Sequence, residues 1–421
     1  MEIVMATDTE PGSPVPEGLP DPSGPPLPTP AVKRQRFWLR RVVVSVLALA
    51  VLAAAFFIIT FIPYVRDAQG EPKEVILATW GRDHGLGPAV AAAEDFYYAH
   101  LNVTPEGGAP TESTDFAAGD PSPGPSASGS SPSPSANATT VAREHLTPPA
   151  TLTSAADGPA LKNEGVWQPV SWKVDGIAPV YATRVRPDAT HTSVLASLMW
   201  IDTKLASTLY VPGYQEPGTV NPFDGALPKK YWESVLANIN GAFRLKDSQG
   251  GFVYKGQTIE PLVDGQATFA IGKDGAISIG KWGRDVKPSS DYQVVRQNLA
   301  LIIDGGKSKV KSGDGFAWGA TTHGENLAWR SAIGQRKDGS IVYIGSPGLS
   351  AEAMADTLVA AGVQRAMVLD MNNWWVAGFY FTHDADGAPV CHKVDSNIQE
   401  GCDRFLNRYK RDSLQFLAKK G

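Results

Sequence analysis

The sequence predicts a mixed α/β (α+β) domain preceded by one transmembrane helix, and three observations support this. An uncharged apolar run extends from Val42 to Ile62. From about Val166 to the C-terminus, short apolar runs alternate with turn residues, which is typical of strands and short helices. Within that region, Ala328–Trp375 reads without interruption as a hairpin, a helix and a further strand. The expected domain therefore contains both antiparallel pairs and a strand-helix-strand unit.

Residues 1–32 are expected to be a disordered cytoplasmic tail. This segment holds five acidic residues, no Lys or Arg, many prolines and few large apolar side chains. Such a composition cannot bury enough apolar surface to offset the entropy lost on folding.

The run Val42–Ile62 is long enough to cross a bilayer as a helix, which takes about 20 apolar residues. A basic cluster precedes it: Lys33, Arg34, Arg36, Arg40 and Arg41. The positive-inside rule then places the N-terminus in the cytoplasm and the C-terminal domain outside it. A cleavable signal peptide is the alternative, but the run is longer than a usual signal core and no well-placed cleavage site follows. The lipid bilayer is thus an expected partner of the chain.

Residues 66–103 are expected to form a juxtamembrane segment. It includes an amphipathic helix at Pro88–Leu101 with Val90, Phe96 and Tyr97 as its apolar positions. Residues 104–162 are rich in Pro, Ser and Gly and predict a flexible stalk that separates the domain from the membrane.

The folded domain is expected to begin near Asn163. Its first half should contain strands and one short helix, at Val180–Val185, Ser193–Ile201, Ser207–Val211, Lys229–Val235 (helix) and Leu236–Asn240. Three turn signals follow within Phe252–Gly280 and suggest a β-meander; they are Val263-Asp264-Gly265, Lys273-Asp274-Gly275 and Ser278-Ile279-Gly280. The last element, Asp403–Lys419, is expected to be a closing helix with its basic residues in solvent.

Local signals define the central stretch Ala328–Trp375 most clearly. Asp338-Gly339 predicts the hairpin turn, Ser350 can cap the following helix, and Gly362 is suited to end it. The next strand runs from Ala366 to Leu369 and leads into polar residues that begin with Asp370. Strand ends of this kind are common ligand sites in α/β sheets.

Cysteine content and charge limit the other possibilities. Cys391 and Cys402 are the only cysteines, and in an oxidising compartment they are expected to form a disulfide rather than a zinc site. The net charge of −5 and the lack of a basic patch interleaved with aromatics give no indication of nucleic-acid binding. Asp370 and Asn372 are too few ligands for Ca²⁺, so neither a metal nor a cofactor is expected.

A set of short motifs in a fixed order resembles the phosphodiester glycosidase family over roughly Val166–Phe381. The motifs are Asn240-Gly241-Ala242-Phe243, Phe269 with Asp274-Gly275 and Gly280, Leu301-Ile302-Ile303-Asp304-Gly305, Arg330-Ser331-Ala332-Ile333-Gly334 with Asp338-Gly339, Gly348-Leu349-Ser350, and Leu369-Asp370. The arrangement of anchor, stalk and domain is similar to that of membrane-anchored actinobacterial members. Two positions depart from the family pattern: Ala242 replaces the second glycine of N-G-G-F, and Met371-Asn372-Asn373 replaces a glycine-rich end.

The resemblance implies hydrolysis of the bond between a sugar's anomeric carbon and a phosphodiester oxygen. Arg330 would bind the phosphate through its guanidinium, and its alternative is a strand-edge arginine paired with Asp370. Asp370 would be the nucleophile or the base that activates water, and its alternative is a loop cap. Asn240 would hold a sugar hydroxyl or the phosphate, and its alternative is a turn residue before Gly241, which itself lies at the predicted binding site.

Other candidates rank below these three. Asn372, Asp304 and Glu325 are second-rank substrate-binding residues, and a second carboxylate is expected if two carboxyl groups share the chemistry. His323 is expected to be a surface residue rather than an acid or base. Trp374 and Trp375 would stack on a sugar or pack in the core, and the core is favoured.

Two functions from different classes are carried forward. The first is a membrane-anchored, extracytoplasmic hydrolase of a sugar-1-phosphodiester in cell-envelope or exopolysaccharide material. The second is a non-catalytic envelope module that binds phosphorylated glycans or a partner protein through the altered loop Met371–Trp375.

Overall fold

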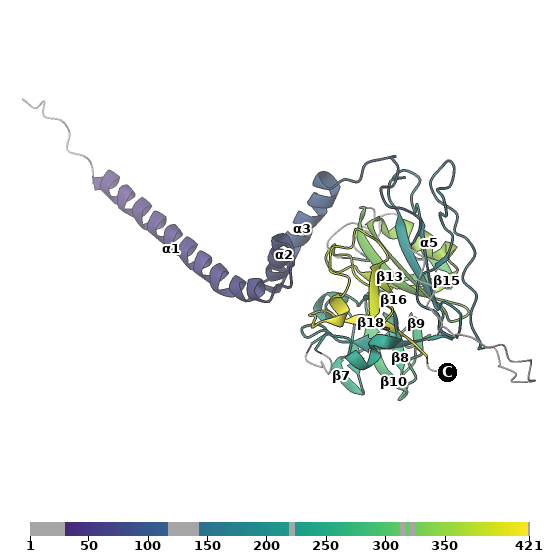
Figure 1. Ribbon diagram of the computed structural model, residues 1–421. Coiled ribbons are helices and arrows are strands. Elements are labelled where there is room, and N and C mark those ends of the chain that lie inside the picture. The colour runs from purple at the N-terminus through teal and green to yellow at the C-terminus, as the bar shows by residue number, and fades with distance from the viewer. Residues whose placement is uncertain (1–29, 117–142, 219–223, 312–316, 320–325, 420–421) are drawn as a thin grey trace, which may run out of the picture. The chain divides into compact units, whose positions relative to one another are not determined.

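The computed structural model describes residues 30–116, 143–218, 224–311, 317–319 and 326–419 (Figure 1). The chain divides into two units, Met1–Gly70 and Glu71–Gly421, which are described separately. Residues 1–29 of the predicted disordered tail, together with His323 and Glu325, lie outside the described residues.

The first unit contains the helix α1 (Pro30–Arg66). Its part Phe37–Arg66 is long and apolar enough to cross a membrane, and it is the one such helix in the part of the chain that the structure describes. Its apolar side chains are exposed within the chain itself, as expected of a helix that packs against lipid. The predicted transmembrane helix is therefore present as a single long apolar helix.

The second unit begins with three helical elements, α2 (Lys73–Asp83), α3 (Gly87–Phe96) and the π-helical turn η1 (Tyr97–Leu101). The predicted juxtamembrane helix corresponds to α3 and η1, whereas α2 was not predicted. Val90 packs close to Gly81 of α2, at 3.0 Å from where a Cβ would stand. The other two predicted apolar positions, Phe96 and Tyr97, are 55% and 47% exposed.

The described ends of the predicted stalk lie on the folded domain. Glu112 forms an ion pair of 2.9 Å with Arg184 of the domain. On the other side of residues 117–142, which lie outside the description, the amide of Leu146 donates to Asp202 at 2.8 Å. The structure at both ends thus differs from the flexible stalk expected there.

Three antiparallel sheets form the body of the second unit. The first has the order β1 (Gln168–Pro169), β2 (Val180–Val185), β3 (Ala196–Ile201), β14 (Ile341–Leu349), β13 (Ala328–Arg336), β15 (Val363–Val368), β11 (Leu301–Asp304), β12 (Lys307–Ser308). The second has the order β7 (Gln257–Glu260), β6 (Phe252–Tyr254), β10 (Tyr292–Gln297), β8 (Ala267–Gly272), β9 (Ile277–Lys281). The third has the order β17 (Pro389–Lys393), β16 (Gly378–His383), β5 (Val235–Asn240), β18 (Ser413–Ala418), β4 (Ala206–Val211). Short helical pieces complete the unit: η2 (Lys229–Ser234), α4 (Leu245–Ser248), α5 (Ala351–Ala360) and η3 (Arg404–Leu406).

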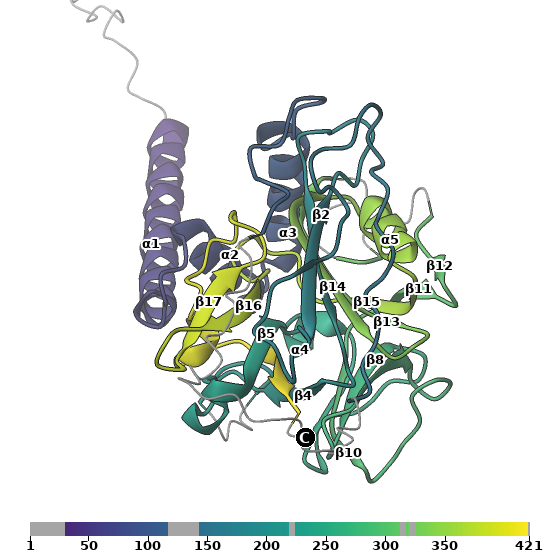
Figure 2. The same cartoon turned by 45° about the vertical axis from the view of Figure 1, so that its right-hand side comes forward.

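The two faces of the eight-stranded sheet bury different cores. Alternate residues along β13 show this, because Ile333 belongs to a large core shared by all three sheets, whereas Ala332 packs on the side of α5. Figure 2 shows α5 beside β15 and β13. This mixed architecture of antiparallel sheets and few helices confirms the predicted fold class.

The central stretch has the predicted order of elements. β13 and β14 form the hairpin, with Gly339 at φ +88° in its turn. The hydroxyl of Ser350 accepts the amide of Ala353 at 3.0 Å and caps α5. Gly362 at φ +78° ends the helix and leads directly into β15. Because each signal is local, the sequence alone was sufficient here.

Two predicted elements were wrong. The β-meander is interrupted, because β10 lies between β6 and β8, and the third turn signal, Ser278-Ile279-Gly280, lies inside β9. The predicted closing helix Asp403–Lys419 is the short 3₁₀ turn η3 followed by the strand β18. β18 pairs with β5 on one side and β4 on the other, and burial on both faces favours a strand over an amphipathic helix.

The predicted disulfide is confirmed. Cys391 of β17 is bonded to Cys402, with their Cα atoms 5.8 Å apart. This disulfide covalently links β17, an edge strand of the third sheet, to the loop before η3.

Candidate functional site

The ends of β5, β13 and β15 meet at Ser331. The amide of Ser331 donates to the carbonyl of Asp370 at 2.8 Å, and the amide of Leu369 donates to the carbonyl of Ser331 at 2.9 Å. The Ser331 hydroxyl accepts hydrogen bonds from Asn240 Nδ2 at 3.0 Å and from the amide of Asp370 at 3.1 Å, and donates to the Asp370 carbonyl at 3.0 Å. We define the strand-end cluster as Asn240, Ser331, Asp370 and Arg411, which includes two of the three first-ranked residues. The third, Arg330, directly precedes Ser331 on β13.

The carboxylate of Asp370 is almost completely buried. Its Oδ1 accepts the amides of Met371 at 2.7 Å and Asn372 at 3.0 Å. Its Oδ2 lies 3.8 Å from Nη2 of Arg411. Burial raises the pKa of Asp370, while the positive charge of Arg411 and the two amides lower it. Asp370 is therefore a carboxyl group held between opposing influences, as acid-base residues commonly are.

Arg411 was not among the residues that the sequence singled out. Its side chain is 12% exposed and its guanidinium lies over the ring of Trp375, 4.5 Å from the centroid. Its Nη1 is buried, and among the described residues no hydrogen-bond partner of this atom is found. The predicted C-terminal helix placed Arg411 in solvent, so this role left no signal in the sequence.

Arg330 is buried next to the cluster. Its Nε donates to the carbonyl of Leu349 at 2.8 Å, and its Nη2 donates to that of Asn326 at 3.4 Å. Burial lowers the pKa of Arg330 to about 10, and the nearby Tyr98 opposes this. The ion pair of Asp370 is with Arg411, not with Arg330 as the structural alternative proposed.

Asn240 and Gly241 have structural contacts of their own. Oδ1 of Asn240 accepts the hydroxyl of Tyr343 at 3.3 Å and the amide of Ala377 at 3.1 Å, so this amide group orients the cluster. A Cβ on Gly241 would stand 2.3 Å from Cγ of Asp412, so only glycine allows that carboxylate to approach so closely.

The second-ranked residues do not all lie here. Asp304 stands opposite Arg365 at the start of β15, at the far end of this strand from Asp370, and its carboxylate is bound to Arg284 at 2.7 and 2.9 Å. Asn372 follows Asp370, and its Oδ1 accepts the amide of Trp374 at 2.9 Å within a turn. The candidates Glu325 and His323 lie outside the described residues.

Met371, one of the departures from the family pattern, fits against a glycine. A Cβ at Gly319 would be 2.1 Å from Sδ of Met371. The space that a glycine at 371 would leave open is thus filled by Met371, and residue 319 has no side chain there. The altered loop is a packed structure and not a gap in the site.

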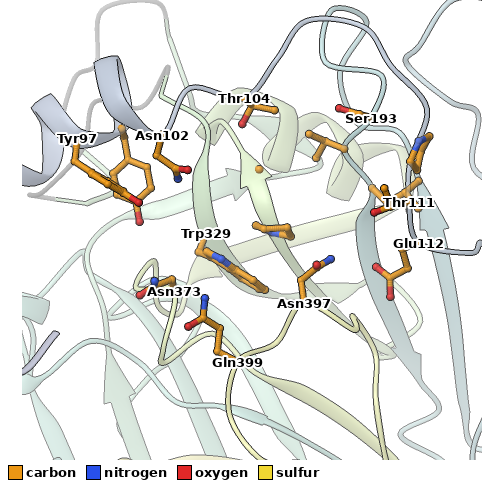
Figure 3. A pocket seen from close by; sticks show the side chains of 16 residues that line it. Tyr97, Asn102, Thr104, Thr111, Glu112, Ser193, Trp329, Asn373, Asn397 and Gln399 are labelled. Atoms are coloured by element: carbon orange, nitrogen blue, oxygen red, sulfur yellow. The ribbon is translucent and has the colours of Figure 1, made fainter. Parts of the chain in front are cut away.

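A cavity of about 440 Å³ is lined by residues from the segments that carry the cluster, but Asn240, Arg330, Ser331, Asp370 and Arg411 do not line it (Figure 3). Trp329 and Asn373, the neighbours of the cluster in sequence, line it together with Tyr98, which interacts with Arg330. Of the two tryptophans that could stack on a sugar or pack in the core, Trp375 is buried in the core, as favoured. Trp329 is the aromatic residue of this region that faces the cavity, and Figure 3 shows its ring among the amides of Asn373, Asn397 and Gln399.

Comparison with known proteins gives one family. Residues 233–370 match the model of the phosphodiester glycosidase family. A comparison with curated proteins found no match.

Three solved structures illustrate the similarity at low identity. The zebrafish N-acetylglucosamine-1-phosphodiester alpha-N-acetylglucosaminidase catalytic domain, auto-inhibited by its pro-peptide, is 14% identical over 57% of this chain and 82% of that chain, with a TM-score of 0.36. A hypothetical protein from Synechocystis is 11% identical over 65% and 68%, with a TM-score of 0.38. A putative exported protein from Burkholderia pseudomallei is 12% identical over 54% and 75%, with a TM-score of 0.26.

Proposed function

Because residues 233–370 belong to the phosphodiester glycosidase family, a family of glycosidase-type hydrolases, we propose that this chain hydrolyses a sugar-1-phosphodiester. The observation that supports this most directly is the Asp370–Arg411 pair at the edge where β5, β13 and β15 meet. A carboxylate and a buried guanidinium are the two groups that such a reaction requires, one for the anomeric carbon and one for the phosphate.

Positive charge near Asp370 suits a phosphodiester. Arg411 has a buried Nη1 without a hydrogen-bond partner among the described residues, so this group is available to a phosphate oxygen. Neutralising the leaving phosphate is the main electrostatic task of the reaction.

Asp370 acts in its ionised form, in one of two ways. As a base, it takes a proton from a water whose oxygen bonds to the anomeric carbon. As a nucleophile, its own oxygen forms that bond, and water later releases the sugar. In both cases the bond between the anomeric carbon and the phosphate oxygen breaks, and the phosphate monoester leaves with the electron pair.

The membrane topology belongs to the same proposal. With α1 across the bilayer and the basic residues Lys33 to Arg41 on the cytoplasmic side, the second unit lies outside the cytoplasm. The substrate would then be cell-envelope or exopolysaccharide material. Fusion of a periplasmically active reporter after Gly421 tests this orientation.

The activity test uses the full chain in detergent with the methyl phosphodiesters of α-N-acetylglucosamine, α-glucose and α-mannose 1-phosphate. Asp370→Asn and Arg411→Gln should each lower release of methyl phosphate by about 100-fold or more, the usual range for removing an acid-base or charge-stabilising group. Arg408→Gln is the matched control, because Arg408 is on the same segment but pairs with the exposed Asp224. Wild-type release no higher than that of the Asp370→Asn variant would refute the proposal.

One observation favours the second candidate, a glycan-binding module without catalysis. Asp370 is 5% exposed, and Met371-Asn372-Asn373 replaces a glycine-rich loop. Calorimetry with the same phosphodiesters separates the two functions. Binding without turnover supports the module, and turnover of a bound compound excludes it.

A further inference from the structure

One wall of the cavity is formed by a segment that precedes the family match. Seven of the lining residues precede residue 113; besides Pro110 they are Tyr97, Tyr98, Asn102, Thr104, Thr111 and Glu112. The family match begins at residue 233, and the sequence predicts part of this segment to be a stalk. We propose that these six residues, the juxtamembrane wall, select the sugar of the substrate. This inference rests on the proposed hydrolase function.

The juxtamembrane wall is firmly attached to the domain at its C-terminal end. Arg184 pairs with Glu112 at 2.9 Å, with both side chains at most one-tenth exposed, and the amide of Ser396 donates to Oε1 of Glu112 at 2.7 Å. The guanidinium of Arg184 also lies over the ring of Phe116, 4.1 Å from its centroid. Such buried, charge-assisted contacts hold Glu112 in one position.

Polar contacts also attach the middle and the start of the segment. The amide of Gly107 donates to the carbonyl of Thr190 at 2.7 Å, and the hydroxyl of Thr192 donates to the carbonyl of Gly108 at 2.7 Å. On α3, Asp95 accepts Nδ2 of Asn326 at 2.8 Å. The juxtamembrane wall is therefore part of the folded unit and not a flexible linker.

The wall also extends towards β13. Tyr98 of η1 lines the cavity together with Trp329, and the charge of Arg330 lowers the pKa of Tyr98. Burial, helped by Glu94 and Tyr97, raises the pKa of Tyr98 to about 12, so its hydroxyl keeps its proton and can donate a hydrogen bond.

The chemistry of the cavity suits a single sugar ring. Its volume lies in the range of about 300 to 1,000 Å³ that is typical of small-molecule sites. The rings of Tyr97, Tyr98 and Trp329 offer apolar faces, and Tyr97 and Tyr98 meet edge to face at 5.4 Å. Amide, hydroxyl and carboxylate groups surround these rings and are partners for several hydroxyls; Figure 3 shows Asn102, Thr104, Thr111 and Glu112 around the opening.

Because these residues stand apart from Asp370 and Arg411, they should affect sugar binding and not the chemical step. The test uses the full chain in detergent and the same three methyl phosphodiesters. Tyr97→Ala and Asn102→Ala remove one aromatic face and one amide of the wall. Val103→Ala is the matched control, because Val103 lies between two wall residues yet is exposed and does not line the cavity.

Calorimetry measures Kd for each sugar, and turnover measures KM and kcat. We expect Kd and KM for the preferred sugar to rise about tenfold in both wall variants, with kcat within about twofold and Val103→Ala unchanged. Unchanged Kd and KM in both wall variants, with turnover still abolished by Asp370→Asn, would overturn this inference and leave the hydrolase function standing. If the wild-type chain neither binds nor hydrolyses any of the three compounds, both proposals fail.

Discussion

Asp370 and Arg411 form the pair on which the proposed chemistry depends. Their oxygen and nitrogen atoms are 3.8 Å apart in a nearly closed environment, where charges interact more strongly than in water. Burial alone would keep Asp370 protonated to a higher pH, and Arg411 acts against this. The arginine therefore has two uses, since it can bind the phosphate and it lowers the pKa of the carboxyl group against the effect of burial.

This double use predicts a change in the pH profile of activity. If Asp370 must be ionised, activity is lost as pH falls through its pKa. Arg411→Gln removes a charge that lowers this pKa, so the acidic limb of kcat/KM should move to higher pH. The variant should thus lose at least about tenfold more activity at pH 5 than at pH 8.

Arg411→Lys, which keeps the charge, is the control. Its acidic limb of kcat/KM should stay at the wild-type pH even if its activity is lower. The profile is measured as kcat/KM between pH 4 and pH 9. If the acidic limb of kcat/KM lies at the same pH in the wild type and in Arg411→Gln, Asp370 is not the titrating group.

At the scale of elements, β18 has the largest consequence for the site. β18 lies between β5 and β4 and begins opposite Asn240, the last residue of β5. Arg411 and Asp412 immediately precede β18 in the chain. Ser413 stands opposite Asn240 in the register. A C-terminal helix could not have brought Arg411 to the end of β15.

This strand assignment predicts a large effect at Phe416, a fully buried side chain of β18. Phe416→Ala should lower the free energy of unfolding by about 3 to 5 kcal/mol, as large-to-small core changes do. Arg408→Ala is the control, because its exposed ion pair with Asp224 is worth at most about 1 kcal/mol. Urea unfolding of the second unit measures both, and a cost at Phe416 no larger than at Arg408 would contradict its central position.

The sequence was informative where signals are local and failed where contacts are distant. Ser350, Gly339 and Gly362 fix the hairpin and α5 within a few residues, so Ala328–Trp375 was predicted well. By contrast, nothing near β10 indicates that it inserts between β6 and β8, because strand order depends on pairing between distant segments. The same reason explains the site: Asn240, Arg330 and Asp370 carry recognisable motifs, whereas Arg411 and the juxtamembrane wall reach it only through the tertiary fold.

For the molecule as a whole, the compact unit begins at Glu71 and not at the predicted domain boundary near Asn163. The segment between these points supplies partners to buried groups of the domain. Glu71 pairs with Lys410 at 2.5 Å, and Arg184 donates to the carbonyl of Ser113 as well as pairing with Glu112. A chain that starts at Asn163 therefore exposes charged groups that the longer chain buries in pairs.

This difference predicts that the chain 71–421 is more stable than the chain 163–421. Without residues 71–162, Arg184 loses the carboxylate of Glu112 and keeps only the carbonyl of Val394 among these contacts. Removing one partner of a buried pair typically costs about 3 to 5 kcal/mol, because the other charge stays in a poorly solvated place. Thermal and urea unfolding of the two chains should show a loss of this order in the shorter one.

Arg184→Met provides the matched control for this mechanism. In the chain 163–421 it should recover part of the lost stability, since an apolar side chain leaves no buried charge without a partner. In the chain 71–421 the same substitution leaves the carboxylate of Glu112 without its arginine partner and should lower the free energy of unfolding. Equal unfolding midpoints for the two chains, or a destabilising effect of Arg184→Met in both, would show that the segment before Asn163 does not stabilise the domain through this pair.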